Sequence, residues 1–279
     1  VIYNLRSKNK TSGNHLELYA QDTWRHETSK SIFSLNYGLR MSYWSWNKEW
    51  LFSPRASLTY VPKRHDNMTF RLATGLYYQR PFYKELRDTT NVGATTIVQL
   101  NKNIQSQRSF QIIAGYEYRF KLGKRPFLFS TELYYKAQDR LNPYTVDNTK
   151  IVYYGRNCAT GNVMGADFKL YGEFVPGTDS WITFSLMRAR MKLNGKNIPQ
   201  PTDQTWSLNM FFTDYFPNTT RWKLNLKACF AGGLPIGAPH TGLEEHVYRS
   251  TAYKRVDVGM NFRALNNEDR HLRKNPIRY

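Results

Sequence analysis

Residues 110–120, which read FQIIAGYEYRF, decide the fold because apolar and polar side chains alternate along them. Successive side chains of a β-strand point to opposite faces of its sheet. One set of alternate positions, here called the apolar parity, comprises Phe110, Ile112, Ala114, Tyr116, Tyr118 and Phe120. The polar parity carries Gln111, Gly115, Glu117 and Arg119. The stretch is predicted to be a strand with one apolar and one polar face.

The same alternation recurs along the whole chain and predicts about eleven strands. The segments that carry it are centred on residues 16–24, 33–43, 52–60, 68–78, 110–120, 127–135, 164–174, 182–186, 206–212, 222–230 and 256–262.

The connections between these segments alternate in length. The short ones carry turn residues and cover 26–30, 62–67, 121–125, 176–180 and 217–220. Four of the others are much longer, at 81–108, 138–162, 194–204 and 232–249, and the fifth is a compact Trp-rich turn at 44–50. An antiparallel meander with tight turns at one end and long loops at the other is typical of outer-membrane barrels, with periplasmic turns and extracellular loops. The predicted fold class is therefore all-β, an antiparallel transmembrane barrel meander.

Composition agrees with this fold and argues against others. The chain has 279 residues, a formal net charge of +19, a mean hydropathy of −0.64 and 15% aromatic residues. No run approaches the ~18 apolar residues of a membrane helix, whereas a barrel needs apolar residues only at alternate positions and places aromatic girdles at both interfaces. No linker or low-complexity tract divides the chain, so residues 1–279 are read as one domain.

No enzyme motif is present: GxSxG, the phosphate-binding P-loop, HExxH and paired CxxC are all absent. We therefore predict no catalytic residues, no cofactor and no metal site. The basic residues lie in turns, loops and isolated strand positions, without the single stripe expected of a nucleic-acid surface, so no nucleic-acid partner is predicted. Nothing in the sequence places Cys158 beside Cys229.

Several strings resemble consecutive barrel strands of TonB-dependent outer-membrane receptors. They are 19–24 (YAQDTW), 36–40 (NYGLR), 52–58 (FSPRASL), 70–75 (FRLATG), 159–161 (ATG) leading to 165–167 (GAD), and 253–259 (YKRVDVG). The resemblance implies an outer-membrane barrel of about 22 strands, plugged by an amino-terminal domain. It also implies active import of a scarce nutrient such as a siderophore, oligosaccharide, peptide or cofactor, driven by TonB in the inner membrane of a Gram-negative cell. The implied partners are outer-membrane lipid, the receptor's own plug domain, the TonB complex, the nutrient and, by analogy with sugar- or peptide-type receptors, a surface lipoprotein.

Parts of the family pattern are missing from this chain. No plug domain or TonB-contacting segment precedes the first strand, and residues 273–279 (RKNPIRY) are not an amphipathic closing strand with a final aromatic. The chain is expected to be a partial barrel domain, about strands 10 to 20 of roughly 22, open at both edges. Two alternatives stay open: another outer-membrane barrel (a porin, an assembly barrel or an adhesion barrel), and a soluble β-rich binding protein.

Charged residues on the polar parity are the first set of candidate site residues. They are expected to face the lumen and to contact the plug or the substrate: Arg40, Arg55, Arg71, Glu117, Arg119, Glu132, Asp167, Lys169 and Glu173. The alternative is mutual pairing across neighbouring strands.

The second set of candidates lies in the first two extracellular connections and could stack on or bind a nutrient: Trp44, Trp46, Trp50, Arg80, Phe82, Tyr83 and Lys84. Their alternative role is packing in an aromatic girdle or within the loops.

Overall fold

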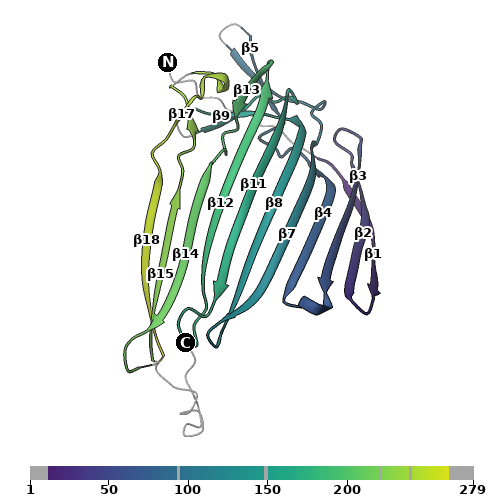
Figure 1. Ribbon diagram of the computed structural model, residues 1–279. Coiled ribbons are helices and arrows are strands. Elements are labelled where there is room, and N and C mark those ends of the chain that lie inside the picture. The colour runs from purple at the N-terminus through teal and green to yellow at the C-terminus, as the bar shows by residue number, and fades with distance from the viewer. Residues whose placement is uncertain (1–11, 93–94, 148–149, 220, 239–240, 264–279) are drawn as a thin grey trace, which may run out of the picture.

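The computed structural model describes residues 12–92, 95–147, 150–219, 221–238 and 241–263, and it shows one curved antiparallel sheet (Figure 1). Its path follows the chain in the order β1-β2-β3-β4-β7-β8-β11-β12-β14-β15-β18. The bounds are β1 His15–Glu27, β2 Ser31–Trp44, β3 Glu49–Pro62, β4 Met68–Gln79, β7 Gln107–Leu122, β8 Arg125–Leu141, β11 Ala159–Gly172, β12 Ser180–Leu193, β14 Trp206–Tyr215, β15 Trp222–Ala231 and β18 Tyr253–Phe262. The expected eleven-strand meander is confirmed, and in this chain it does not close into a barrel.

Helix is nearly absent from the described residues, as the alternation predicts. Two 3-10 turns occur, η1 at Lys63–His65 and η2 at Leu243–Glu245. No helix in the described part of the chain is long and apolar enough to cross a membrane.

The strand register keeps the two parities on separate faces across the sheet. One row of paired residues runs Leu72, Ala114, Leu133, Ala166, Leu186 and Trp206. The adjacent row runs Arg71, Gly115, Glu132, Asp167, Ser185 and Ser207. Arg or Lys on the lipid face at mid-bilayer would cost ~2–4 kcal/mol each, so the polar row belongs to the inner wall.

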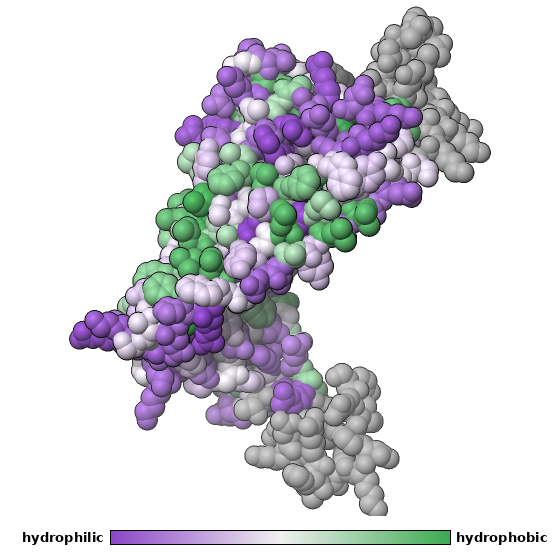
Figure 2. Space-filling model, turned by 90° about the vertical axis from the view of Figure 1, so that its right-hand side faces the viewer, coloured by the Kyte–Doolittle hydropathy of each residue, from purple (hydrophilic) through white to green (hydrophobic). Residues whose placement is uncertain are grey.

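The apolar face is largely uncovered by protein atoms. Leu133 is 57% exposed, Leu72 47% and Phe110 46%, values that a soluble sandwich core would not allow. A band of hydrophobic residues lies between hydrophilic ends in Figure 2. This is the surface that a transmembrane strand presents to lipid.

The two ends of the sheet differ as the loop lengths predict. The tight turns gather at one end, and the long connections at the other (Figure 1). The long connections contain short strands that alternation alone did not predict: β5 Arg87–Val92, β6 Thr95–Leu100, β9 Tyr144–Asp147, β10 Lys150–Tyr153, β13 Lys196–Pro199, β16 Pro235–Ile236 and β17 Tyr248–Arg249. The loops therefore form a structured cover at that end. Residues 273–279 lie outside the described part of the chain.

A small core lies where this cover meets the sheet. Its buried members are Ala159, Met191, Leu193, Ile198 and Leu243. Leu243 of η2 comes from the β15–β18 connection and packs against inner-wall residues at the top of β12.

Candidate functional site

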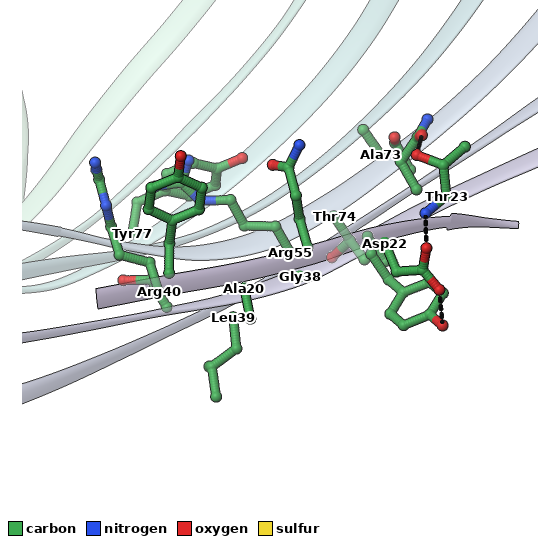
Figure 3. Close-up of a pocket in the computed structure, with 17 residues that line it drawn as sticks. Ala20, Asp22, Thr23, Gly38, Leu39, Arg40, Arg55, Ala73, Thr74 and Tyr77 are labelled. Carbon is green, nitrogen blue, oxygen red and sulfur yellow. Dashed lines mark hydrogen bonds between the residues drawn. The ribbon is translucent and has the colours of Figure 1, made fainter. Parts of the chain in front are cut away.

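A pocket on the polar face of β1–β4 brings two of the predicted residues, Arg40 and Arg55, together (Figure 3). Its cavity volume is about 500 Å³, and its lining includes Tyr19, Arg40, Arg55 and Tyr77. Figure 3 shows Arg40, Arg55 and Tyr77 on one side of the sheet and Leu39 on the other, as the strand parity requires.

Glu17 of β1 lines a smaller adjoining pocket, of about 300 Å³, which shares Arg40 and Arg55 with the first and also includes Arg80. Its Oε2 lies 3.3 Å from Nη2 of Arg40, and its Oε1 lies 3.8 Å from Nη2 of Arg80. Nε2 of His15 lies 3.0 Å from the same Oε1. One carboxylate thus serves two guanidinium groups, so Arg40 and Arg80 together keep an excess of positive charge.

Arg55 adds a third guanidinium without adding an acid. Its Cζ lies 4.4 Å from the ring centroid of Tyr77, a cation–π contact. Gly75 makes room for this stack, since a Cβ there would lie 3.1 Å from Cγ of Arg55 and 3.0 Å from the Tyr77 ring. No ion pair joins Arg55 to a carboxylate in the described part of the chain. In the adjoining pocket, Arg40, Arg55 and Arg80 face the single carboxylate of Glu17, and this excess of positive charge is chemistry suited to an anion.

A second charged group lies further along the inner wall. Arg71 of β4 reaches Glu117 of β7 through two contacts, Nη1 to Oε1 at 2.5 Å and Nη2 to Oε2 at 3.3 Å. Arg119 lies 4.0 Å from the same carboxylate. Arg71 and Glu117 are therefore paired across neighbouring strands, Arg119 lies beside them on β7, and any plug contact by the three stays a prediction.

The remaining inner-wall candidates are not drawn into one site. Glu132 and Asp167 are register partners on β8 and β11, while Nζ of Lys169 lies 5.7 Å from the ring of Tyr171. Glu173 lies beyond the end of β11, and its Oε1 accepts a hydrogen bond from the Gly177 backbone in the short turn.

The three loop tryptophans occupy different surroundings. Trp46 donates from Nε1 to the carbonyl of Asn101 at 3.5 Å. Trp44 ends β2 at the inner parity opposite His15. Trp50 lies on β3 at the outer parity, with its ring 4.7 Å from that of Tyr43. Substrate contact by any of them stays a prediction.

The predicted residues of the second extracellular connection also lie in different surroundings. Phe82 packs edge-on against Tyr153 at 5.4 Å, and Tyr83 and Lys84 are exposed. Arg80 alone joins the cationic pocket.

Sequence reasoning missed Glu49, which ties the loops together. Its Oε2 accepts hydrogen bonds from Nδ2 of Asn47 at 2.9 Å and from Oγ of Ser106 at 2.7 Å. Its Oε1 lies 3.4 Å from Nη1 of Arg140. The Glu49 side chain is 13% exposed, so its charge is held by these partners. An isolated acid in a Trp-rich turn carries no sequence signal for such a role.

A second buried carboxylate was missed in the β13–β14 connection. Asp203 is fully buried, accepts from the Ala189 backbone at 2.6 Å, and pairs with Nη2 of Arg249 at 2.5 Å. Arg249 belongs to β17, so this pair fastens the last long connection to the sheet.

Glu85 is a third buried acid at the loop end. Its oxygens accept from the Phe82 backbone at 3.0 Å and from Nε2 of Gln107 at 3.2 Å. Burial raises the pKa of the Glu85 carboxyl above its ordinary value, against the opposing effect of these two hydrogen bonds.

Two solved structures resemble this chain in fold. The ferric enterobactin receptor of Pseudomonas aeruginosa, a point mutant, has a TM-score of 0.62 at 14% sequence identity, over 91% of this chain and 38% of its own. The ferric-catecholate import receptor Fiu of Escherichia coli K12, in its closed form, has a TM-score of 0.61 at 13% identity, over 91% of this chain and 39% of its own. The chain thus spans under half the length of these neighbours. No curated protein sequence matches it.

An antiparallel meander with an apolar outer face, a charged inner wall and loops sorted by length defines the wall of a large outer-membrane-type barrel. The family model described as TonB dependent receptor-like, beta-barrel matches residues 2–270. The chain therefore belongs to the TonB-dependent receptor β-barrel family, a family of receptors and transporters that is not an enzyme class.

Proposed function

We propose that this chain is about half of the barrel wall of an outer-membrane receptor that imports an anionic nutrient, with a siderophore-type iron chelate as the first candidate. The observation that carries the proposal is the pocket of Arg40, Arg55 and Arg80, in which the carboxylate of Glu17 pairs with Arg40 and Arg80. The names of the two structural neighbours, a ferric enterobactin receptor and a ferric-catecholate import receptor, support the same substrate class.

The complete receptor would lie in the outer membrane of a Gram-negative cell. Residues 1–279 would supply about half of a barrel of roughly 22 strands, and other parts of the protein would supply the plug domain and the contact with the TonB complex. A surface lipoprotein is a further proposed partner for a sugar- or peptide-type substrate.

Each guanidinium can form charge-assisted hydrogen bonds with an anionic ligand, worth about 1.5–3 kcal/mol apiece. Arg55 is the best placed, because stacking on Tyr77 orients its fork without neutralising it. Arg40 and Arg80 would exchange part of their contact with Glu17 for the ligand.

The test measures binding of ferric chelates to the full-length receptor and TonB-dependent iron uptake by cells. Arg55→Gln should weaken binding of an anionic chelate by about tenfold or more. Arg119→Gln is the matched control, because Arg119 lies on the same wall, 62% exposed and outside the pocket. Equal affinities of the wild type and both variants would contradict the proposal that this pocket binds the chelate. Uptake that persists without TonB would favour a porin or another passive barrel.

Plug contact is proposed separately for the inner wall. Arg55→Ala and Arg71→Ala in the full-length protein should raise passive antibiotic entry or alter TonB-dependent uptake, because an Arg fork can hold a plug carboxylate and release it. Unchanged values for both measurements would reject the contact.

A further inference from the structure

The tight turn between β12 and β13 carries the only Asn-Gly pair in the sequence, Asn194-Gly195. Both residues have positive φ, +50° for Asn194 and +81° for Gly195, as in a two-residue type I′ hairpin turn. Both are exposed, and apart from the chain neighbours no heavy atom lies within 4 Å of the position that a Cβ on Gly195 would take. The turn is therefore open to water.

The side-chain amide of Asn194 joins this hairpin to the connection between β15 and β18. Its Nδ2 donates a hydrogen bond to Oε1 of Glu244 in η2 at 2.6 Å, across 50 residues of sequence. A buried leucine precedes each partner, since Leu193 is 1% exposed and Leu243 0%. Both leucines belong to the small core under the loops. The hydrogen bond thus closes the edge of that core.

This contact requires a donor at position 194. Among the residues that the structure describes, Glu244 takes part in no ion pair, and the next residue is a second acid, Glu245. A carboxylate in place of the Asn194 amide would put two negatively charged acceptors in contact, which repel each other. The chemical state of a single side chain therefore decides whether η2 is held to the hairpin.

We propose that Asn194 is a site of spontaneous deamidation, and that the product releases η2 from the β12–β13 hairpin. The backbone nitrogen of Gly195 attacks Cγ of Asn194 and forms a succinimide ring. The bond between Cγ and Nδ2 breaks, and the side-chain nitrogen leaves as ammonia with the proton of the Gly195 amide. Water then opens the ring at one of its two carbonyls and leaves aspartate or isoaspartate. The reaction consumes water, releases ammonia and needs no oxidant, reductant or cofactor.

Gly195 makes this asparagine more reactive than its neighbours. A side chain on the residue after an asparagine crowds the attacking nitrogen, and glycine has none. Asn197 is the internal comparison, because it is exposed in the same hairpin and precedes the β-branched Ile198. The turn must open briefly before the nitrogen can reach Cγ, and exposed turns open at a small cost in free energy. Because the bond to Glu244 restrains the amide, this contact sets the rate.

Both products break the contact with Glu244. Each replaces the Nδ2 donor by a carboxylate oxygen, and isoaspartate also lengthens the backbone between Leu193 and Lys196, which are paired in the register. The loosening stays local, because Arg249 still pairs with Asp203 further along the same connection. The result is a loop cover that opens around η2 with age, whatever substrate the receptor imports.

The first experiment incubates the purified full-length receptor in mildly alkaline buffer and follows Asn194 and Asn197 by peptide mass spectrometry. We expect aspartate and isoaspartate to accumulate at Asn194 while Asn197 stays unchanged. Glu244→Ala should speed the conversion roughly three- to tenfold, since the hydrogen bond that restrains the amide is lost. An unmodified Asn194, equal conversion of the two asparagines, or an unchanged rate in Glu244→Ala would overturn the proposal.

The second experiment measures the effect of the product with Asn194→Asp in the full-length receptor. Limited proteolysis should cut the connection between β15 and β18 about tenfold faster than in the wild type, because a donor is lost and a repulsion is added. Asn194→Gly removes the donor without adding charge and should show a smaller increase. Asn197→Asp is the matched control, with the same charge change in the same hairpin, and should be cut like the wild type. Equal cutting of Asn194→Asp and either the wild type or Asn197→Asp would overturn the proposed release of η2.

Discussion

Arg71 and Glu117 face each other across β4 and β7 in a two-point ion pair, with Nη1 2.5 Å from Oε1 and Nη2 3.3 Å from Oε2. The Arg71 side chain is 51% exposed and that of Glu117 20%, so water screens the attraction. A double-mutant cycle with Arg71→Ala and Glu117→Ala should give a coupling of only ~0.2–1 kcal/mol in the free energy of unfolding. Coupling well above this range would mean that the pair is shielded, for instance by a plug seated over it.

Gly165 is expected to resist substitution because Tyr134 lies over it. A Cβ at Gly165 would lie 2.5 Å from the Leu186 carbonyl oxygen and would collide with the Tyr134 hydroxyl. Gly165→Ala should cost about 1–3 kcal/mol, seen as a lower temperature at which the folded band is lost in gel electrophoresis. Gly115→Ala is the control on the same inner wall, because its Cβ would meet nothing closer than 3.6 Å. Equal behaviour of the two variants would contradict the packing argument.

Arg249 is expected to hold the β15–β18 connection in place through Asp203. Arg249→Ala would leave a fully buried carboxylate with only the Ala189 backbone as its donor. The expected local cost is about 2–3 kcal/mol, below that of a fully buried pair because Arg249 is 35% exposed. Limited proteolysis should then cut the connection faster, while the strands stay protected. Asp203→Asn combined with Arg249→Ala should restore part of the protection, since no charge is left buried.

Glu85 makes the stability of its loop depend on pH. Its folded-state pKa is raised by burial, so the native loop binds more protons than the unfolded one between the unfolded and folded pKa values. The stabilising contribution is complete below the unfolded pKa and is lost as the pH rises through the folded pKa. Glu85→Gln should therefore match the wild type at pH 4 and exceed it in the free energy of unfolding at pH 7. A variant that is less stable than the wild type at pH 7 would contradict this sign.

The orientation of the sheet can be tested with single cysteines in a background lacking Cys158 and Cys229. A cysteine at Asn91, in β5 of the loop end, should react with an impermeant reagent on intact cells. A cysteine at Lys124, in the β7–β8 turn, should react only after permeabilisation. The reverse pattern would invert the proposed orientation.

The strands could be predicted from sequence because the alternation in a segment such as 110–120 is local and is enforced by lipid along its whole length. The short hairpins of the loops could not, since polar runs such as Arg87–Val92 carry no parity signal outside a membrane. Trp50 lies at the boundary between the membrane strands and the loops. It was expected in a loop, and β3 already begins at Glu49, so its ring lies at the outer parity beside Tyr43.

For the candidate site, the sequence predicted the face on which individual residues lie, and it did not predict which of them meet. Parity placed Arg40 and Arg55 on the inner wall, and Arg80 was expected at the loop end. Their meeting depends on Glu17, which lies on β1, far from Arg80 in sequence. The register of four strands decides that contact, and no local pattern encodes it.

The carboxylate of Glu49 has a consequence for how such receptors can be recombined. Because its oxygens contact Asn47 within its own turn, Ser106 before β7 and Arg140 at the end of β8, three successive surface connections share one acceptor. A chimera that exchanges a single loop would separate that acceptor from its donors. Grafts between receptors should therefore succeed only when cut in the strands, with residues 44–49, 101–106 and 140–157 carried over as one module.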